Sequence, residues 1–216
     1  RISFMNELAL LAEEVGADPD DETIDLYERI LAGDFAPPRP AASRDGFTPR
    51  HNLPADLTPF LGREAEVDEV RRLLQTPHPR LVTITGLGGA GKTRLATEVA
   101  RTFVDVSAPA GTFADGVFFV NLAPVEPAEP VGEQLAEQIA LALDVALAAN
   151  AAPLAQVTAM LAGKATLLVL DNFEHMTAAT PALLHLLHAV PTLKALVTSR
   201  VRINAAGERV VPLDGL

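Results

Sequence analysis

The residues best suited to chemistry form one short run, Gly86-Leu-Gly-Gly-Ala-Gly-Lys-Thr93, which matches the phosphate-loop pattern G-x-x-x-x-G-K-[ST] at every fixed position. Glycines let the backbone curl so that successive N–H groups point at an anion. Lys92 supplies a full positive charge for the β and γ phosphates. Thr93 supplies a hydroxyl for Mg²⁺, which prefers oxygen ligands. The run therefore predicts a site for a nucleoside diphosphate or triphosphate with Mg²⁺.

The flanking residues give this loop the strand–loop–helix context that the motif requires. The apolar stretch 81–85 reads as a strand and the stretch 94–101 reads as a helix. The residues expected to hold the phosphates are Gly86, Leu87, Gly88, Gly89, Ala90, Gly91, Lys92, Thr93 and the following Arg94.

Beyond residue 64 helical and strand patterns alternate, which is typical of a parallel sheet covered on both faces. Strands are expected at 81–85, 117–121, 166–171, 193–198 and 208–212, and helices at 64–74, 131–148, 154–161 and 181–190. The predicted fold is an α/β P-loop NTPase with a parallel sheet of about five strands, preceded by an N-terminal helical hairpin.

Two further strands end in residues that suit phosphate chemistry. The wholly apolar strand at 166–171 ends in Asp171, which would reach the Mg²⁺ shell because parallel strands point their carboxyl ends at the ligand crevice. The alternative is that Asp171 caps the next helix. The strand at 193–198 leads to Arg200, whose planar fork matches phosphate oxygens and could sense the γ-phosphate. Its alternative role is that of a solvated arginine at a strand exit.

The residue after Asp171 bears on the rate of hydrolysis. Many P-loop enzymes place a glutamate there to activate water, whereas Asn172 cannot accept a proton and can only orient a water molecule. Glu174 lies nearby in sequence, and its reach is left open. We therefore predict slow hydrolysis, with Asp171, Asn172 and Arg200 as the catalytic residues.

Composition and charge divide the chain into three parts. Residues 1–34 hold ten acids and two arginines and show two short helical stripes, so they predict the end of a larger helical domain. Residues 35–59 contain six prolines and read as a linker, which could also lie along the next domain. Residues 60–216 form the predicted nucleotide-binding domain. Because Arg1 begins without Met inside a helical pattern, we expect a piece of a longer chain.

Other features limit the classes of partner and compartment. There are no cysteines, so disulfides and thiolate metal sites are excluded, and the five histidines lack metal-binding spacing. No basic stripe is present, so no direct nucleic-acid contact is expected. No apolar run is long enough to cross a membrane and no signal peptide is visible, which favours a cytoplasmic protein.

Four segments together resemble the nucleotide-binding domain of bacterial STAND regulators, which are signal-transducing ATPases related to NB-ARC domains. They are 52–64 (NLPADLTPFLGRE), 81–96, 171–175 (DNFEH) and 196–200 (LVTSR). Residues 10–19 and 23–33 resemble the last helices of the bacterial transcriptional activator domain, which is TPR-like. Together these segments suggest the middle of a SARP- or LuxR-like transcription regulator.

The STAND resemblance implies roles for further residues and partners. The residues implied on the adenine side are Phe60, Leu61, Gly62 and Arg63. ADP would favour a closed state and ATP an open, oligomerising one, and the switch would involve other domains of the same full-length protein.

Other nucleotide-dependent classes fit the residues less well. A small-molecule kinase should carry an acceptor site and an Arg-rich lid. A GTPase should carry an N/T-K-x-D motif, and an ABC-type ATPase should carry an L-S-G-G signature. None of these features is evident in the sequence. A turnover ATPase or kinase remains the alternative to a switch. A scaffold that has lost nucleotide binding is disfavoured because Lys92, Thr93 and Asp171 are intact.

Overall fold

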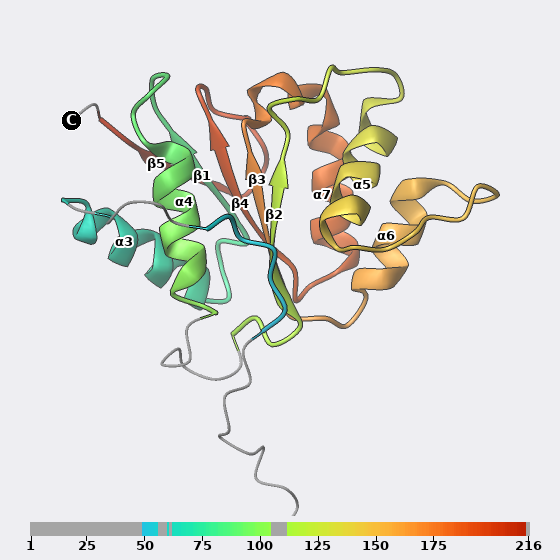
Figure 1. The fold of residues 1–216 in the computed structure, drawn as a ribbon, viewed down its shortest axis with the longest axis horizontal. Coiled ribbons are helices and arrows are strands. Elements are labelled where there is room, and N and C mark those ends of the chain that lie inside the picture. The colour runs from blue at the N-terminus through green and yellow to red at the C-terminus, as the bar shows by residue number, and fades with distance from the viewer. Residues whose placement is uncertain (1–48, 56–59, 61, 105–111, 215–216) are drawn as a thin grey trace, which may run out of the picture. The chain divides into compact units, whose positions relative to one another are not determined.

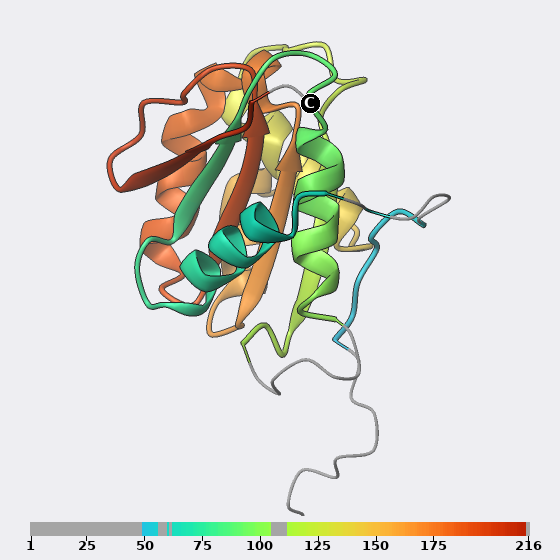
Figure 2. The ribbon, with the colours of Figure 1, turned by 90° about the vertical axis from the view of Figure 1, so that its left-hand side faces the viewer.

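Residues 49–55, 60, 62–104 and 112–214 are described by the computed structural model, and they form an α/β fold around one sheet (Figures 1 and 2). All of these residues belong to one compact unit. The expected helical hairpin at 1–34, most of the expected linker and Leu61 lie outside the described residues.

The sheet is parallel throughout and has the strand order β2-β3-β4-β1-β5. Its strands are β1 (Leu81–Thr85), β2 (Gly116–Asn121), β3 (Thr166–Asp171), β4 (Lys194–Ser199) and β5 (Glu208–Pro212). Every residue of β3 and β4 is buried, as expected for central strands covered on both faces. The predicted fold class, a five-stranded parallel sheet of the P-loop type, is confirmed.

Helices cover both faces of the sheet and bury two separate apolar clusters (Figure 1). On one face lie α3 (Glu64–Gln75) and α4 (Lys92–Arg101), which bury side chains such as Leu74 and Leu95. On the other lie α5 (Val131–Ala142), α6 (Pro153–Leu161) and α7 (Thr180–Ala189), packed around residues such as Ile139 and Leu183. The sheet is thus sandwiched between two layers of helices, and the ends of its strands are available to form binding sites.

Most predicted elements agree with the structure to within two residues, but the predicted helix 131–148 was too long. The helix ends at Ala142, and Asp144 adopts a left-handed conformation with φ of 56°. The N–H of Val145 then bonds back to the carbonyl of Ala140 at 3.1 Å, which terminates the helix. Two short 3-10 turns, η1 (Phe173–His175) and η2 (Thr177–Ala179), were not predicted.

The described end of the expected linker lies along the outer edge of β2. The carbonyl of Arg50 accepts a hydrogen bond from the N–H of Val117 at 2.9 Å. The side-chain amide of Asn52 donates to the carbonyl of Phe119 at 2.9 Å and accepts from its N–H at 2.6 Å. These residues of the expected linker therefore lie along the nucleotide-binding domain.

Candidate nucleotide-binding site

The glycine-rich loop joins β1 to α4 at the carboxyl edge of the sheet (Figure 1). Gly89 and Gly91 have φ values of 80° and 86°, in the left-handed region, and Gly91 is the residue that precedes α4. A Cβ atom added at Gly88, Gly89 or Gly91 would meet no other atom within 4 Å. The loop therefore leaves open space above its backbone, at the positively polarised start of a ten-residue helix.

Gly86 is required for a different reason. A Cβ atom there would lie 2.5 Å from the carbonyl oxygen of Leu213. The N–H of Leu213 in turn donates to the carbonyl of Thr85 at 2.6 Å. The chain beyond β5 thus packs directly against the start of the loop, and only glycine permits that approach.

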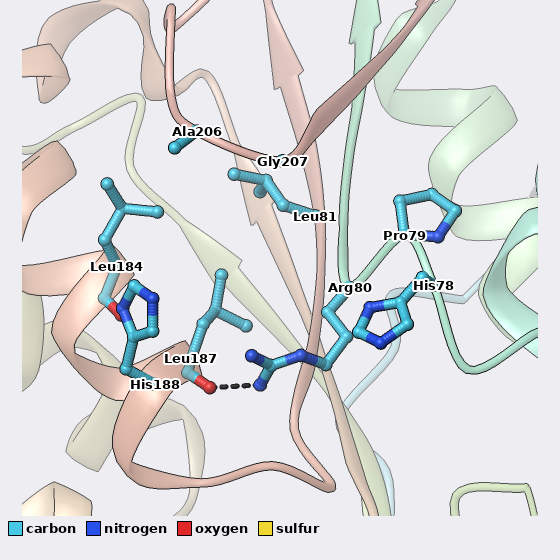
Figure 3. Close-up of a pocket in the computed structure, with 9 residues that line it drawn as sticks. All are labelled: His78, Pro79, Arg80, Leu81, Leu184, Leu187, His188, Ala206 and Gly207. Atoms are coloured by element: carbon cyan, nitrogen blue, oxygen red, sulfur yellow. Dashed lines mark hydrogen bonds between the residues drawn. The ribbon is translucent and has the colours of Figure 1, made fainter.

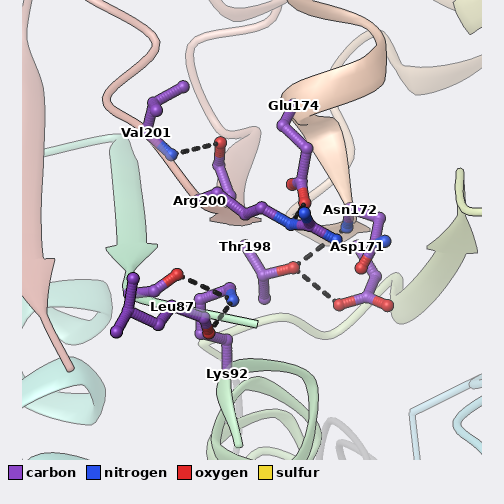
Figure 4. Close-up of polar contacts among 10 residues, drawn as sticks. Leu87, Lys92, Asp171, Asn172, Glu174, Thr198, Arg200 and Val201 are labelled. Carbon is purple, nitrogen blue, oxygen red and sulfur yellow. Dashed lines mark hydrogen bonds and ion pairs between the residues drawn. The ribbon is translucent and has the colours of Figure 1, made fainter. Parts of the chain in front are cut away.

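The Lys92 side chain folds over the loop and is only 8% exposed. Its Nζ donates to the carbonyls of Gly86 and Leu87, both at 2.9 Å (Figure 4). An ammonium group has three donors, so among the described residues these two contacts leave one N–H for an anion over the loop. Thr93 is exposed in the first turn of α4, where its hydroxyl is accessible to a ligand.

The structure places Asp171 and Thr198 in direct contact on neighbouring strands. Asp171 is 5% exposed, and its Oδ1 accepts a hydrogen bond from the Thr198 hydroxyl at 2.6 Å (Figure 4). The same hydroxyl accepts from the backbone N–H of Asn172 at 3.0 Å. Asn172 has a left-handed φ of 62°. Thr198 therefore fixes both the carboxylate orientation and the turn that follows β3.

The position of β4 explains why these residues meet. This strand lies between β1, which leads into the glycine loop, and β3, which ends in Asp171. Thr85 and Ser199 are paired in the register of β1 and β4, so Arg200 leaves β4 beside the first residue of the loop. Sequence reasoning missed Thr198. The available signal was a hydroxyl residue two positions before Arg200 at the end of an apolar strand.

Arg200 and Glu174 form an ion pair at this edge. The Nε of Arg200 lies 3.0 Å from Oε1 of Glu174 (Figure 4). The arginine side chain is 62% exposed, whereas that of the glutamate is 12% exposed. The sequence did not show which group the Glu174 side chain contacts, and in the structure it contacts Arg200.

The residues expected on the adenine side make contacts of their own. The guanidinium of Arg94 lies 5.7 Å from the centre of the Phe60 ring, a cation–π distance. Gly62 has a left-handed φ of 84°, and its N–H donates to the Glu64 carboxylate at 3.1 Å. The hydrogen bond from the Glu64 backbone and the one from Gly62 lower the pKa of that carboxyl.

Arg63 has a packing role in addition to its predicted place near adenine. It is 8% exposed, and its Nη2 donates to the carbonyl of Asp214 at 2.8 Å. Its Nη1 lies 3.7 Å from the carboxylate of Glu66. The contact with Asp214 joins the start of α3 to the segment that follows β5.

The comparisons with known proteins agree with this geometry. Residues 59–199 match the family model of the AAA ATPase domain. The chain belongs to the AAA ATPase domain family. Over 95% of its length it is 36% identical to regulatory protein AfsR of Streptomyces griseus and 34% identical to regulatory protein AfsR of Streptomyces coelicolor. It spans about a fifth of each AfsR protein, since the match covers 21% of their length.

A solved structure supports the fold of this ATPase domain. The Aeropyrum pernix ORC2 protein, determined as ADPNP–ADP complexes, has a TM-score of 0.52 and 16% identity, over 74% of this chain and 50% of that one. The family match confirms the predicted ATPase domain, and the AfsR relatives that the chain resembles are named regulatory proteins. None of the described helices is long and apolar enough to cross a membrane.

A cavity of about 560 Å³ lies at the opposite, amino-terminal edge of the sheet in this ATPase domain (Figure 3). It is lined by His78, Pro79, Arg80, Leu81, Leu184, Leu187, His188, Ala206 and Gly207. Arg80 donates to the carbonyl of Leu187 near the end of α7. At the same edge, burial lowers the pKa of Lys194 to about 8, and the charge of Arg80 adds to the effect. This cavity is separate from the glycine loop.

Proposed function

We propose that the chain is the ATP- and ADP-binding switch module of a larger, multidomain transcription regulator, and that it hydrolyses ATP slowly. One observation carries the proposal. The open glycine loop with its Lys92 ammonium, the buried Asp171 and the exit of Arg200 all lie at the carboxyl edge of three adjacent strands. Ligands of open parallel α/β sheets bind at that edge.

The residues at this edge fit a magnesium nucleotide. The N–H groups of residues 86–93 and the start of α4 suit phosphates, and Lys92 would neutralise the β and γ oxygens. Thr93 and Asp171 would hold Mg²⁺, which commonly takes only one or two protein ligands beside phosphate oxygens and water. When bound, Mg²⁺ would supply charge neutralisation of the phosphates. The described residues contain no group of three or more His, Cys, Asp or Glu that could form a metal site without a nucleotide.

The base would lie beside the edge formed by Phe60, Gly62, Arg63 and Arg94, together with Leu61. The face of a purine can stack on a guanidinium or an aromatic ring, and the Phe60–Arg94 pair offers both. Because the sequence carries no guanine-reading N/T-K-x-D motif, adenine is the proposed base. ATP and ADP should therefore bind in preference to GTP.

A switch is favoured over a turnover enzyme by the groups that face the reaction. Asn172 carries no carboxylate to act as a base, and the carboxylate of Glu174 is paired with Arg200. The relatives that the chain matches over 95% of its length are named regulatory proteins. We propose a cytoplasmic regulator in which ATP promotes a homo-oligomer through other domains of the same protein, with no nucleic-acid contact from this module.

Calorimetric titration of ADP with Mg²⁺ tests the pocket. Lys92→Ala should weaken ADP binding by about tenfold to a hundredfold, because a hydrogen bond to a charged group contributes about 1.5–3 kcal/mol. Lys164→Ala is the matched control, since that lysine is exposed and lies before β3 at the opposite edge. Equal ADP affinity in wild type and Lys92→Ala would refute the pocket. Displacement of ADP by an equal concentration of GTP would refute the adenine preference.

A further inference from the structure

We propose that Glu174 is the positioning residue of the γ-phosphate sensor, and that it holds Arg200 with its terminal nitrogens directed to the phosphate edge. The inference rests on the proposed nucleotide site and adds to it a residue that acts through Arg200. It is carried by the ion pair, by the difference in exposure of its two members and by the rigid turn beneath Glu174.

Arg200 needs such a partner because of where it stands. It follows Ser199, which pairs with Thr85 across β4 and β1, so its backbone lies beside the start of the glycine loop. Its side chain is 62% exposed. A long exposed side chain samples many rotamers and loses that freedom on binding a ligand. A contact that fixes the guanidinium beforehand reduces the loss.

Glu174 is built into a rigid part of the site. The turn that carries it begins at Asn172, whose N–H is held by the Thr198 hydroxyl at 3.0 Å. The next residue, Phe173, is completely buried and anchors the turn in the core. The Glu174 side chain is only 12% exposed, so it is largely enclosed by the protein. The exposed arginine is thus paired with a largely buried acid.

The ion pair is made through Nε of Arg200 and not through its terminal nitrogens. Glu174 Oε1 engages Nε of Arg200 at 3.0 Å. A guanidinium has five N–H donors in a planar fork, and the two terminal nitrogens carry four of them. A pair made through Nε therefore leaves the terminal end of the fork able to take phosphate oxygens. The same pair engages one of the two oxygens of the Glu174 carboxylate.

The second oxygen of Glu174 shows that the protein does not fully satisfy this carboxylate. Oε2 is buried, and no described residue donates a hydrogen bond to it. A buried acceptor without a partner is unfavourable for folding and calls for an explanation in a native structure. The pair that Oε1 makes with Arg200 offsets part of the cost of burying this carboxylate.

The test is the ratio of ATP affinity to ADP affinity, measured by calorimetry with Mg²⁺ for the whole chain. Arg200→Ala should lower the ATP preference about tenfold or more. Glu174→Gln should lower it about two- to fivefold, the range of a partly exposed ion pair, with ADP affinity unchanged. In the Arg200→Ala background, Glu174→Gln should have no further effect. Asp68→Asn is the matched control, because it breaks an ion pair with Arg71 on α3 and should leave the ratio unchanged.

Four results for Glu174→Gln would overturn the inference. One is an equal loss of ATP and ADP affinity in Glu174→Gln, which indicates a structural role. Another is a raised ATP preference, which indicates that Glu174 competes with the γ-phosphate for Arg200. The third is a hundredfold loss of kcat with unchanged ATP affinity, which indicates a general base. If wild type binds neither nucleotide, the proposed function fails together with the inference, whereas normal binding with a normal ratio in Glu174→Gln refutes the inference alone.

Discussion

Replacement of Thr198 by valine removes one hydroxyl at the centre of the site and leaves the shape of the side chain almost unchanged. That hydroxyl donates to Asp171 at 2.6 Å and accepts from the N–H of Asn172 at 3.0 Å. Thr198 is completely buried, so water cannot simply take its place. The substitution therefore breaks both contacts without creating a cavity.

The magnitude follows from the two partners. A hydrogen bond to a charged group contributes about 1.5–3 kcal/mol, and a buried N–H left without an acceptor costs a further 1–3 kcal/mol or so. Because the Asn172 N–H is only partly buried, water recovers part of that cost, and we expect a net loss of about 3 kcal/mol. In a chain of this size 1 kcal/mol shifts Tm by about 2–4 °C, so Tm should fall by about 6–12 °C.

Thermal unfolding of four chains measures this loss. Wild type is compared with Thr198→Val, with Thr198→Ser, which keeps the hydroxyl, and with Thr83→Val. Thr83 is also completely buried in a strand, but no described residue hydrogen-bonds its hydroxyl. Thr83→Val should be neutral or slightly stabilising, because it removes an unsatisfied polar group. Thr198→Ser should retain most of the stability.

A binding measurement separates the site from the fold. With Asp171 no longer oriented, Thr198→Val should lose Mg²⁺-dependent ATP affinity by about tenfold, which corresponds to about 1.4 kcal/mol. ADP binding in the presence of a chelator should change much less. Equal Tm shifts in Thr198→Val and Thr83→Val, or a Thr198→Ser chain as unstable as the valine variant, would refute this reasoning.

Two other predictions concern charge and rate. The folded-state pKa of Lys194 is lowered to about 8 by burial and by the charge of Arg80, so the unfolded chain binds the proton more tightly between pH 8 and its ordinary pKa of 10.5. The free energy of unfolding should therefore rise with pH through that window by an amount of order 1 kcal/mol. Lys194→Met should be more stable than wild type at pH 7 and should lack this rise when unfolding is measured as a function of pH. Identical pH slopes in wild type and Lys194→Met would contradict the assignment. Wild type should hydrolyse ATP well below about 1 per second, and Asn172→Glu should raise turnover if the missing carboxylate limits the rate. Wild-type turnover of about 10 per second or faster, abolished by Asp171→Ala, would identify a working enzyme instead of a switch.

The fold was largely predictable because burial dominates its sequence pattern. Apolar runs such as 166–171 have few alternatives to a central strand, and the glycine loop marks the strand before it and the helix after it. The end of α5 was not predictable from periodicity, because the apolar pattern continues past Ala142. Asp144, which tolerates the left-handed conformation that ends the helix, was the local signal.

Only those site residues that belong to recognisable motifs could be predicted from the sequence. Phosphate-loop residues and the two strand-end residues Asp171 and Arg200 stand out by type and position. The contacts among them depend on strand order, which places β4 between β1 and β3, and no local pattern encodes that order. Thr198 and Glu174 act through such contacts between segments, so their partners became visible only in three dimensions.

The short segment along β2 has a consequence for how the protein behaves in solution. An uncovered strand at the rim of a sheet is a template on which another chain can add a strand and begin to aggregate. Here the carbonyl of Arg50 and the amide of Asn52 occupy the outward groups of Val117 and Phe119. A preparation trimmed to residue 60, the predicted domain start, would expose that rim, so its self-association would reflect the loss of this covering segment and not the nucleotide state.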